Sequence, residues 1–134
     1  MPATNKQIVQ AYVDAFNHGD LDALVALFAP DALVHGVLGS GGLEVVRPVW
    51  GELITCFAIN LEIEDLVAED DRVVARYVER GRSSASFRGG PVTRQPYAVP
   101  AMEWFELRDG LIRQRWGARD MAAQFRQMGL PVPG

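Results

Sequence analysis

Apolar residues near the start of the chain recur every three or four positions, the spacing that places side chains on one face of a helix. In the first such stretch they are Ile8, Val9, Tyr12, Val13 and Phe16. Thr4 can cap this helix and Gly19 can end it. Asp20 can cap a second, shorter helix that stops at Ala29-Pro30 and has an inner face of Leu21, Leu24, Leu27 and Phe28. The pattern predicts two amphipathic helices.

The next stretch predicts a strand, a loop and a third helix. Residues 32–38 are strand-like, and glycines at positions 36, 39, 41 and 42 indicate a flexible loop. A helix is expected over 43–58. Pro48 weakens this prediction unless it lies in the first turn, where the missing backbone N–H costs little.

From position 61 onward the helical spacing gives way to alternation of apolar and polar residues. Two strands are expected around a turn at Glu69-Asp70-Asp71, and two more, over 96–107 and 111–118, around Asp109-Gly110. A short helix follows. Helices that precede a run of antiparallel strands are typical of an α+β domain, in which a strongly curved sheet packs one face on the helices.

Composition narrows the classes of protein to consider. A chain of 134 residues with 49% hydrophobic and 22% charged residues is expected to form one folded domain over 1–134. A net charge of −4 argues against nucleic acid as a partner. The single Cys56 allows no internal disulfide, and two histidines make a His/Cys metal site improbable. With no run of eighteen apolar residues, we expect a cytoplasmic protein without membrane contact.

Asp120, at the junction between the last strand and the last helix, is the first candidate for chemistry. An Asp at this position can simply cap the helix. In an apolar pocket, desolvation raises the pKa of a carboxyl group and a neighbouring arginine lowers it, so the group can exchange protons near neutral pH. The two roles are compatible.

Alternation on the strand around Arg80 places Arg76 and Arg82 on the same face. If that face points inward, it must open on a pocket or lie near acids, because a buried unpaired charge is costly. In the alternative, these arginines are solvated, and Tyr77 and Val73 pack inside.

Alternation leaves the orientation of the following hairpin open. One face of its first strand carries Met102, Trp104 and Glu106, and the other carries Glu103, Phe105 and Leu107. Each face has one acid and bulky apolar groups, so either could line a pocket.

Three segments resemble the nuclear transport factor 2-like superfamily, and within it the SnoaL-like polyketide cyclases: "NHGDLDALVALFAPDALVHG", "DRVVARYVERGR" and "FELRDGLIRQRWGARD". The resemblance implies a cone-shaped α+β barrel of the cystatin-like kind, with a deep apolar pocket and one carboxylate that acts as acid and base. Asp120 matches that carboxylate, and Trp116 matches a tryptophan four residues earlier. The family register favours Met102, Trp104 and Glu106 as the inward face.

"YVERGR", "VPAMEWFELRDG" and "GLP" also resemble limonene epoxide hydrolases. Arg80 matches that family's arginine and Asp120 its second aspartate. Arg82 stands where the first aspartate is expected, and Val34 and Gly36 lie near the positions of the water-binding tyrosine and asparagine; neither side chain can hold a water. Epoxide opening would therefore need another acid, Glu103 or Glu106.

The resemblance implies an enzyme without cofactor or metal, a cyclase or isomerase for a polyketide-like or other hydrophobic small molecule. Asp120 would be the general acid/base, with Arg80 assisting. The expected substrate-binding residues are Trp104, Trp116, Met102, Glu106, Arg82 and His35, although a structural or surface role is the simpler interpretation of His35.

Two other functions stay open, an epoxide-hydrolase-like enzyme and a non-catalytic protein that binds small ligands, because this fold hosts unrelated functions. Pairing through the exposed face of the sheet is common in the superfamily. A homodimer is therefore expected by resemblance.

Overall fold

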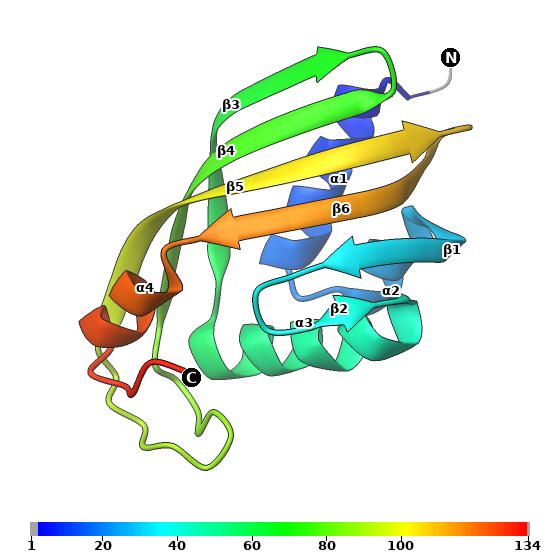
Figure 1. Cartoon of the computed structure of the whole chain (residues 1–134). Coiled ribbons are helices and arrows are strands. Elements are labelled where there is room, and N and C mark those ends of the chain that lie inside the picture. The colour runs from blue at the N-terminus through cyan, green and yellow to red at the C-terminus, as the bar shows by residue number, and fades with distance from the viewer. Residues whose placement is uncertain (1–2, 134) are drawn as a thin grey trace.

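The computed structural model describes residues 3–133 and places the helices mainly ahead of the long strands (Figure 1). The elements are α1 (Asn5–Asn17), α2 (Leu21–Ala26), β1 (Phe28–His35), β2 (Ser40–Gly41), α3 (Leu43–Phe57), β3 (Asn60–Glu69), β4 (Arg72–Arg82), β5 (Pro96–Arg108), β6 (Leu111–Arg119) and α4 (Met121–Gln127). The predicted α+β organisation is confirmed.

The strands form one curved sheet in the order β2-β1-β6-β5-β4-β3. Neighbours are antiparallel except β1 and β6, which run parallel. β2 and β3 are the two edges, so the sheet wraps without closing into a barrel. Helices α1 and α3 lie on its inner side (Figure 1), and α4 lies beyond the end of β6.

The two hairpins turn where the sequence predicts. Asp70 has a positive φ of 53°, and Asp109 and Gly110 have φ values of 54° and 76°. Two consecutive positive φ angles in a two-residue loop match the right-handed twist of the flanking strands. These turns fix which side chains of β4, β5 and β6 face inward.

Two boundary predictions are wrong. α2 ends at Ala26, so Leu27 and Phe28 are not part of its inner face, and β1 begins at Phe28 rather than at position 32. Pro30 is tolerated inside β1 because the pairing with β6 is irregular between Phe28 and Leu33.

Pro48 lies inside its helix, outside the first turn in which a proline costs little. α3 begins at Leu43, which puts Pro48 past the first turn. Its ring removes one backbone hydrogen bond there, and the side chain is exposed on the outside of the helix.

The hydrophobic core lies between the inner face of the sheet and the helices. On β4 the buried residues alternate as Val73, Ala75, Tyr77 and Glu79, and on β5 as Tyr97, Val99, Ala101, Glu103, Phe105 and Leu107. Both rows are apolar except for one glutamate each. These two buried carboxylates mark the place where the core becomes polar.

Candidate functional site

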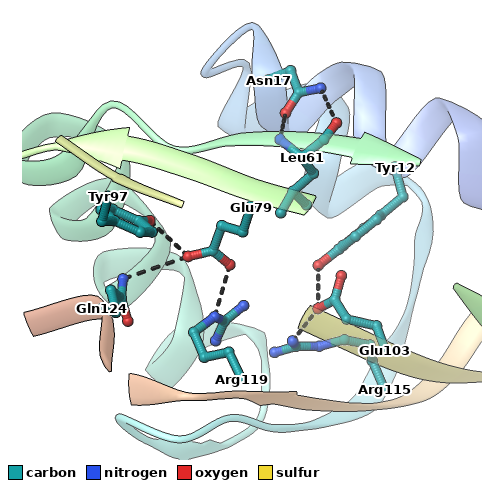
Figure 2. A network of polar contacts seen from close by, with 9 residues as sticks. All are labelled: Tyr12, Asn17, Leu61, Glu79, Tyr97, Glu103, Arg115, Arg119 and Gln124. Carbon is teal, nitrogen blue, oxygen red and sulfur yellow. Dashed lines mark hydrogen bonds and ion pairs between the residues drawn. The ribbon is translucent and has the colours of Figure 1, made fainter. Parts of the chain in front are cut away.

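Glu103 lies at the centre of the buried polar region. Its side chain is 2% exposed, and its Oε2 accepts a hydrogen bond from the Tyr12 hydroxyl at 3.0 Å. The same oxygen forms an ion pair with Nη1 of Arg115, which is 6% exposed. Tyr12 comes from α1, Glu103 from β5 and Arg115 from β6, so three elements converge on one carboxylate (Figure 2).

Glu79 forms a second cluster beside the first. Nε of Arg119 donates to Oε1 of Glu79 at 2.7 Å, and the Tyr97 hydroxyl donates to Oε2 at 2.6 Å. Nε2 of Gln124 on α4 donates to the same Oε2 at 3.4 Å. In Figure 2, Arg115 and Arg119 reach from β6 toward the two glutamates.

The backbone of β6 explains how two arginines can occupy the interior. Arg115, Gly117 and Arg119 alternate on the inward face, and Gly117 pairs directly with Glu103 on β5. A Cβ on Gly117 would collide with Nη1 of Arg115 and lie 3.4 Å from Oε2 of Glu103. The glycine thus leaves the space that the ion pair fills.

The network is electrically balanced, with two carboxylates and two guanidinium groups. A buried charge is tolerated when it is paired and hydrogen-bonded. Burial opposes the charge of Arg119, yet the nearby carboxylates of Glu79 and Glu103 raise its pKa above the ordinary value. Arg119 therefore stays positively charged and interacts electrostatically with both Glu79 and Glu103.

The tyrosines of the network remain hydrogen-bond donors. Burial, followed by the charge of Glu103, raises the pKa of Tyr12 far above its usual range. Burial and the charge of Glu79 do the same for the pKa of Tyr97. Neither hydroxyl can act as a base near neutral pH.

Three buried polar atoms near Glu103 have no hydrogen-bond partner among the described residues. They are the Tyr77 hydroxyl, Oε1 of Glu103 and Nε of Arg115. Native proteins seldom leave such atoms unpaired, and each case asks for an explanation. Burial, and then the charge of Glu103, raises the pKa of Tyr77, so its hydroxyl lies close to this carboxylate.

A cavity adjoins this polar cluster. Its polar wall consists of Glu103, Arg115 and Arg119, and its other walls are mainly apolar residues of α1, α3, β3 and the loop 36–39. The volume is about 40 Å³, which is room for about one water molecule. Of the three tryptophans, Trp50 lines the cavity and is 4% exposed.

A match to a family model shows which protein family this chain belongs to. The model of the SnoaL-like polyketide cyclase matches residues 6–128. The chain belongs to this family.

Solved structures agree with the SnoaL-like assignment. IdmH from Streptomyces antibioticus, a candidate polyketide cyclase, is 29% identical with a TM-score of 0.83, over 95% of this chain and 100% of that chain. A candidate polyketide cyclase from Pseudomonas putida is 25% identical with a TM-score of 0.80, over 94% and 98%. A Catenulispora acidiphila protein with a ketosteroid isomerase-like fold, 23% identical with a TM-score of 0.80 over 96% and 97%, supports the fold alone.

The structure does not bring Asp120 and Arg80 together in the SnoaL-like cavity. Asp120 is exposed and caps α4, accepting a hydrogen bond from the backbone N–H of Ala123 at 3.0 Å. Arg80 is on the outer face of β4 and pairs with Glu62 at 3.5 Å. The inward orientation considered for Arg80 and Arg82 is wrong, because Tyr77 and Glu79 occupy the inward positions of β4.

The expected register of the β5 hairpin is also wrong. Met102 and Trp104 are 52% and 43% exposed, and Glu106 lies on the same outer face, because Glu103 and Phe105 point inward. Trp116 is opposite Trp104 and is 37% exposed. The ring of His35 stacks on Trp116 at a centroid distance of 5.0 Å, so these expected pocket residues gather outside the sheet.

Sequence reasoning did not identify Glu79 and Glu103 as the centres of the buried polar network, although the sequence contains a signal for both. Glu79 and Glu103 each interrupt a row of apolar residues that alternates along a strand. An acid in such a row must be paired when the row is buried. The distant partners Tyr12, Arg115 and Arg119 could not be assigned from that pattern, because their positions depend on how the elements pack.

Residues 3–133 contain neither a cluster of metal-ligating side chains nor a helix suited to crossing a membrane. No three or more His, Cys, Asp or Glu side chains come close enough to hold a metal ion. No helix in this range is long and apolar enough to cross a membrane.

Proposed function

We propose that the protein is a cofactor-free enzyme that removes a proton from a carbon next to a carbonyl group of an apolar, polyketide-like substrate. This is the first step of both ring closure and isomerisation. The observation that carries the proposal is a buried carboxylate at the polar wall of the cavity, Glu103, whose Oε1 has no hydrogen-bond partner among residues 3–133.

Glu103 is the proposed base. Its Oε1 takes the proton, and the electron pair of the C–H bond passes to the carbonyl oxygen as an enolate. In ring closure the enolate carbon attacks a second carbonyl carbon, a C–C bond forms, and the proton on Glu103 returns to the new alkoxide. Atoms and charge balance without an oxidant, a reductant or water.

Arg115 and Arg119 are the proposed stabilisers of the negative oxygen. Fixed cations in a site that excludes water act where charge develops in the transition state. The Tyr12 hydroxyl holds Oε2 of Glu103, which keeps the carboxylate in one orientation and leaves Oε1 for the substrate.

The cavity must enlarge to admit such a substrate, because ligand pockets usually measure several hundred Å³. The loop 36–39 is the proposed gate. Val37 and Leu38 line the cavity, and Gly36 and Gly39 are joined by a single backbone hydrogen bond of 3.1 Å. The ends of a glycine-flanked loop can rotate without moving the sheet.

Deuterium exchange tests the proton transfer directly. 1-Indanone in D₂O exchanges its α-hydrogens slowly, and NMR measures the rate. We expect the wild type to accelerate the exchange and Glu103→Gln to lose about 100-fold or more of this acceleration. Asp120→Asn is the matched variant at the other candidate carboxylate and should keep it.

The reverse pattern, activity lost in Asp120→Asn and kept in Glu103→Gln, would assign the base to Asp120 and contradict the proposal. If Glu103→Gln does not fold by circular dichroism, Tyr12→Phe replaces it. That variant keeps the ion pair to Arg115 and should lose about tenfold through misorientation of Glu103. Ligand binding without exchange in the wild type would instead favour a non-catalytic binding protein.

One observation favours a second candidate function, epoxide hydrolysis. Two carboxylates, Glu79 and Glu103, are buried on the same face, and a reaction that adds water across a C–O bond uses one group for the water and another for the epoxide oxygen. Glu106 lies on the outer face and does not supply the second acid. Styrene oxide in ¹⁸O-labelled water tests this candidate, because enzymatic hydrolysis would place ¹⁸O in the diol product.

A further inference from the structure

An open groove of about 640 Å³ lies where β4 and β5 meet the end of α4, and Tyr97 is the one residue of the Glu79 network described above that lines it. Its lining includes Asn60, Arg80, Arg82, Pro96, Ala98 and Gln127. The proposed catalysis uses none of these residues.

The strand register explains why the surface is hollow here. Arg80 lies opposite Ala98 on β5, and Arg82 lies opposite Pro96. Two long side chains therefore border two short ones on the same face of the sheet. The short residues leave apolar surface in the groove, and both arginines line it beside them.

The arginines of the groove are weakly neutralised. Arg80 pairs with Glu62 at 3.5 Å, and both side chains are about half exposed, at 52% and 56%. Such surface pairs contribute little and are displaced easily. Arg82 donates one N–H to the backbone carbonyl of Arg94 at 2.9 Å, and no carboxylate among residues 3–133 forms an ion pair with it.

A neutral donor adds to the two cations. Gln127 accepts a hydrogen bond from the backbone N–H of Ala98 through Oε1 at 2.8 Å. This bond uses the carbonyl oxygen of the Gln127 amide, so the NH₂ group is left to donate a hydrogen bond in the groove. The chain as a whole has a net charge of −4, so the positive charge of the groove is a feature of this part of the surface and not of the whole protein.

We propose that this groove binds a small organic anion, with its carboxylate or phosphate group between Arg80 and Arg82 and its apolar part on Ala98 and Pro96. Residues two apart on a strand lie about 6.5 Å apart, a separation that two long arginine side chains can span around one anionic group. Guanidinium groups match carboxylate and phosphate oxygens through paired N–H donors. The proposal does not depend on the proposed catalysis, because Arg80 and Arg82 face away from Glu103.

NMR titration with phenyl phosphate, benzoate and benzyl alcohol tests this site. The three probes share an aromatic ring and differ in charge. We expect both anions to shift the backbone signals of residues 80–82 and 96–98, and benzyl alcohol to leave them unchanged. The tighter anion distinguishes a phosphate from a carboxylate as the preferred group.

Variants separate a local site from general attraction. Arg80→Gln/Arg82→Gln should weaken binding of the anions about tenfold or more. Arg108→Gln/Arg113→Gln removes the same charge from the far end of the β5–β6 hairpin and should change the affinity less than about twofold. Equal weakening in both double variants, equal binding of benzyl alcohol, or no shift with either anion would overturn the proposal.

Discussion

Glu103 and Gly117 face each other across β5 and β6, and the missing side chain of Gly117 gives Arg115 its place beside the glutamate. The buried ion pair therefore depends on a residue that takes no part in it. In a strand interior a glycine is ordinarily destabilising relative to alanine. Here the reverse applies, because the space next to Cα is occupied.

Gly117→Ala should destabilise the protein by about 3 kcal/mol or more, the scale expected when a buried ion pair loses its geometry. The new methyl group would displace the Arg115 guanidinium and leave Glu103 without its cation. Urea unfolding measures the change. Gly39→Ala is the control, since its Cβ would lie 3.8 Å from Val49, an ordinary contact. Equal stability of Gly117→Ala and the wild type would contradict this role.

Two tyrosines on neighbouring strands give a matched pair of hydroxyl deletions. Tyr97→Phe removes the 2.6 Å hydrogen bond to Glu79 and should cost about 1–3 kcal/mol, because a buried carboxylate oxygen loses its main partner. Tyr77→Phe removes a buried hydroxyl that lies near Glu103 without a hydrogen bond of good geometry among the described residues, and it should cost less than Tyr97→Phe. Thermal and urea unfolding measure both. A Tyr77→Phe variant as unstable as Tyr97→Phe would show that the two environments are equivalent.

Stability should fall at high pH. Burial raises the pKa of all three tyrosines, Tyr12, Tyr77 and Tyr97, above the ordinary 10.0. Below pH 10 both the folded and the unfolded chain hold these protons, so the stabilisation is complete. Above pH 10 the unfolded chain releases them and the folded chain does not, which favours unfolding by about 1.4 kcal/mol per pH unit for each tyrosine.

Tyrosinate absorbance and urea unfolding between pH 8 and about 11 check this behaviour, on either side of the ordinary tyrosine pKa. The folded protein should show no tyrosinate signal until it unfolds. Tyr97→Phe should reduce the pH dependence by about one third, because one of three groups is gone. A tyrosinate signal in the folded protein near pH 10 would be inconsistent with the buried network.

Local sequence patterns were sufficient for most of the fold and insufficient for the site. The spacing of apolar residues and the turn at Asp109-Gly110 predicted the element order, because both depend on neighbours in the chain. The inward face of β5 depends on register across the sheet. There a shift of one residue exchanges Trp104 for Glu103, and the partner that makes a buried glutamate tolerable, Arg115, comes from another strand.

The outer face of the sheet carries exposed apolar residues that bear on the oligomeric state. Trp104 and Trp116 are cross-strand neighbours, and with Met102 they form an exposed apolar surface on β5 and β6. We propose that a second copy of the chain covers it, as the family resemblance implies. Exposed apolar patches of this kind mark interaction surfaces.

Light scattering with size-exclusion chromatography should find a dimer for the wild type and a monomer for Trp104→Lys/Trp116→Lys. Two charges at the centre of an apolar interface would remain unpaired there. Val45→Lys introduces a charge at an exposed residue of α3 and should leave the dimer intact. A monomeric wild type, or a dimer in all three proteins, would reject this surface.

Asp120 offers a final prediction that separates capping from catalysis. Its Oδ1 accepts the N–H of Ala123 at 3.0 Å, the bond that satisfies the first turn of α4. Asp120→Ala should therefore cost about 1 kcal/mol of stability, whereas Asp120→Asn should cost only a few tenths, because asparagine caps helices equally well. If capping is its whole contribution, both variants keep the deuterium exchange of 1-indanone at temperatures where they are folded. If Asp120 is the base, Asp120→Asn loses exchange without losing stability, a combination that a structural role cannot produce.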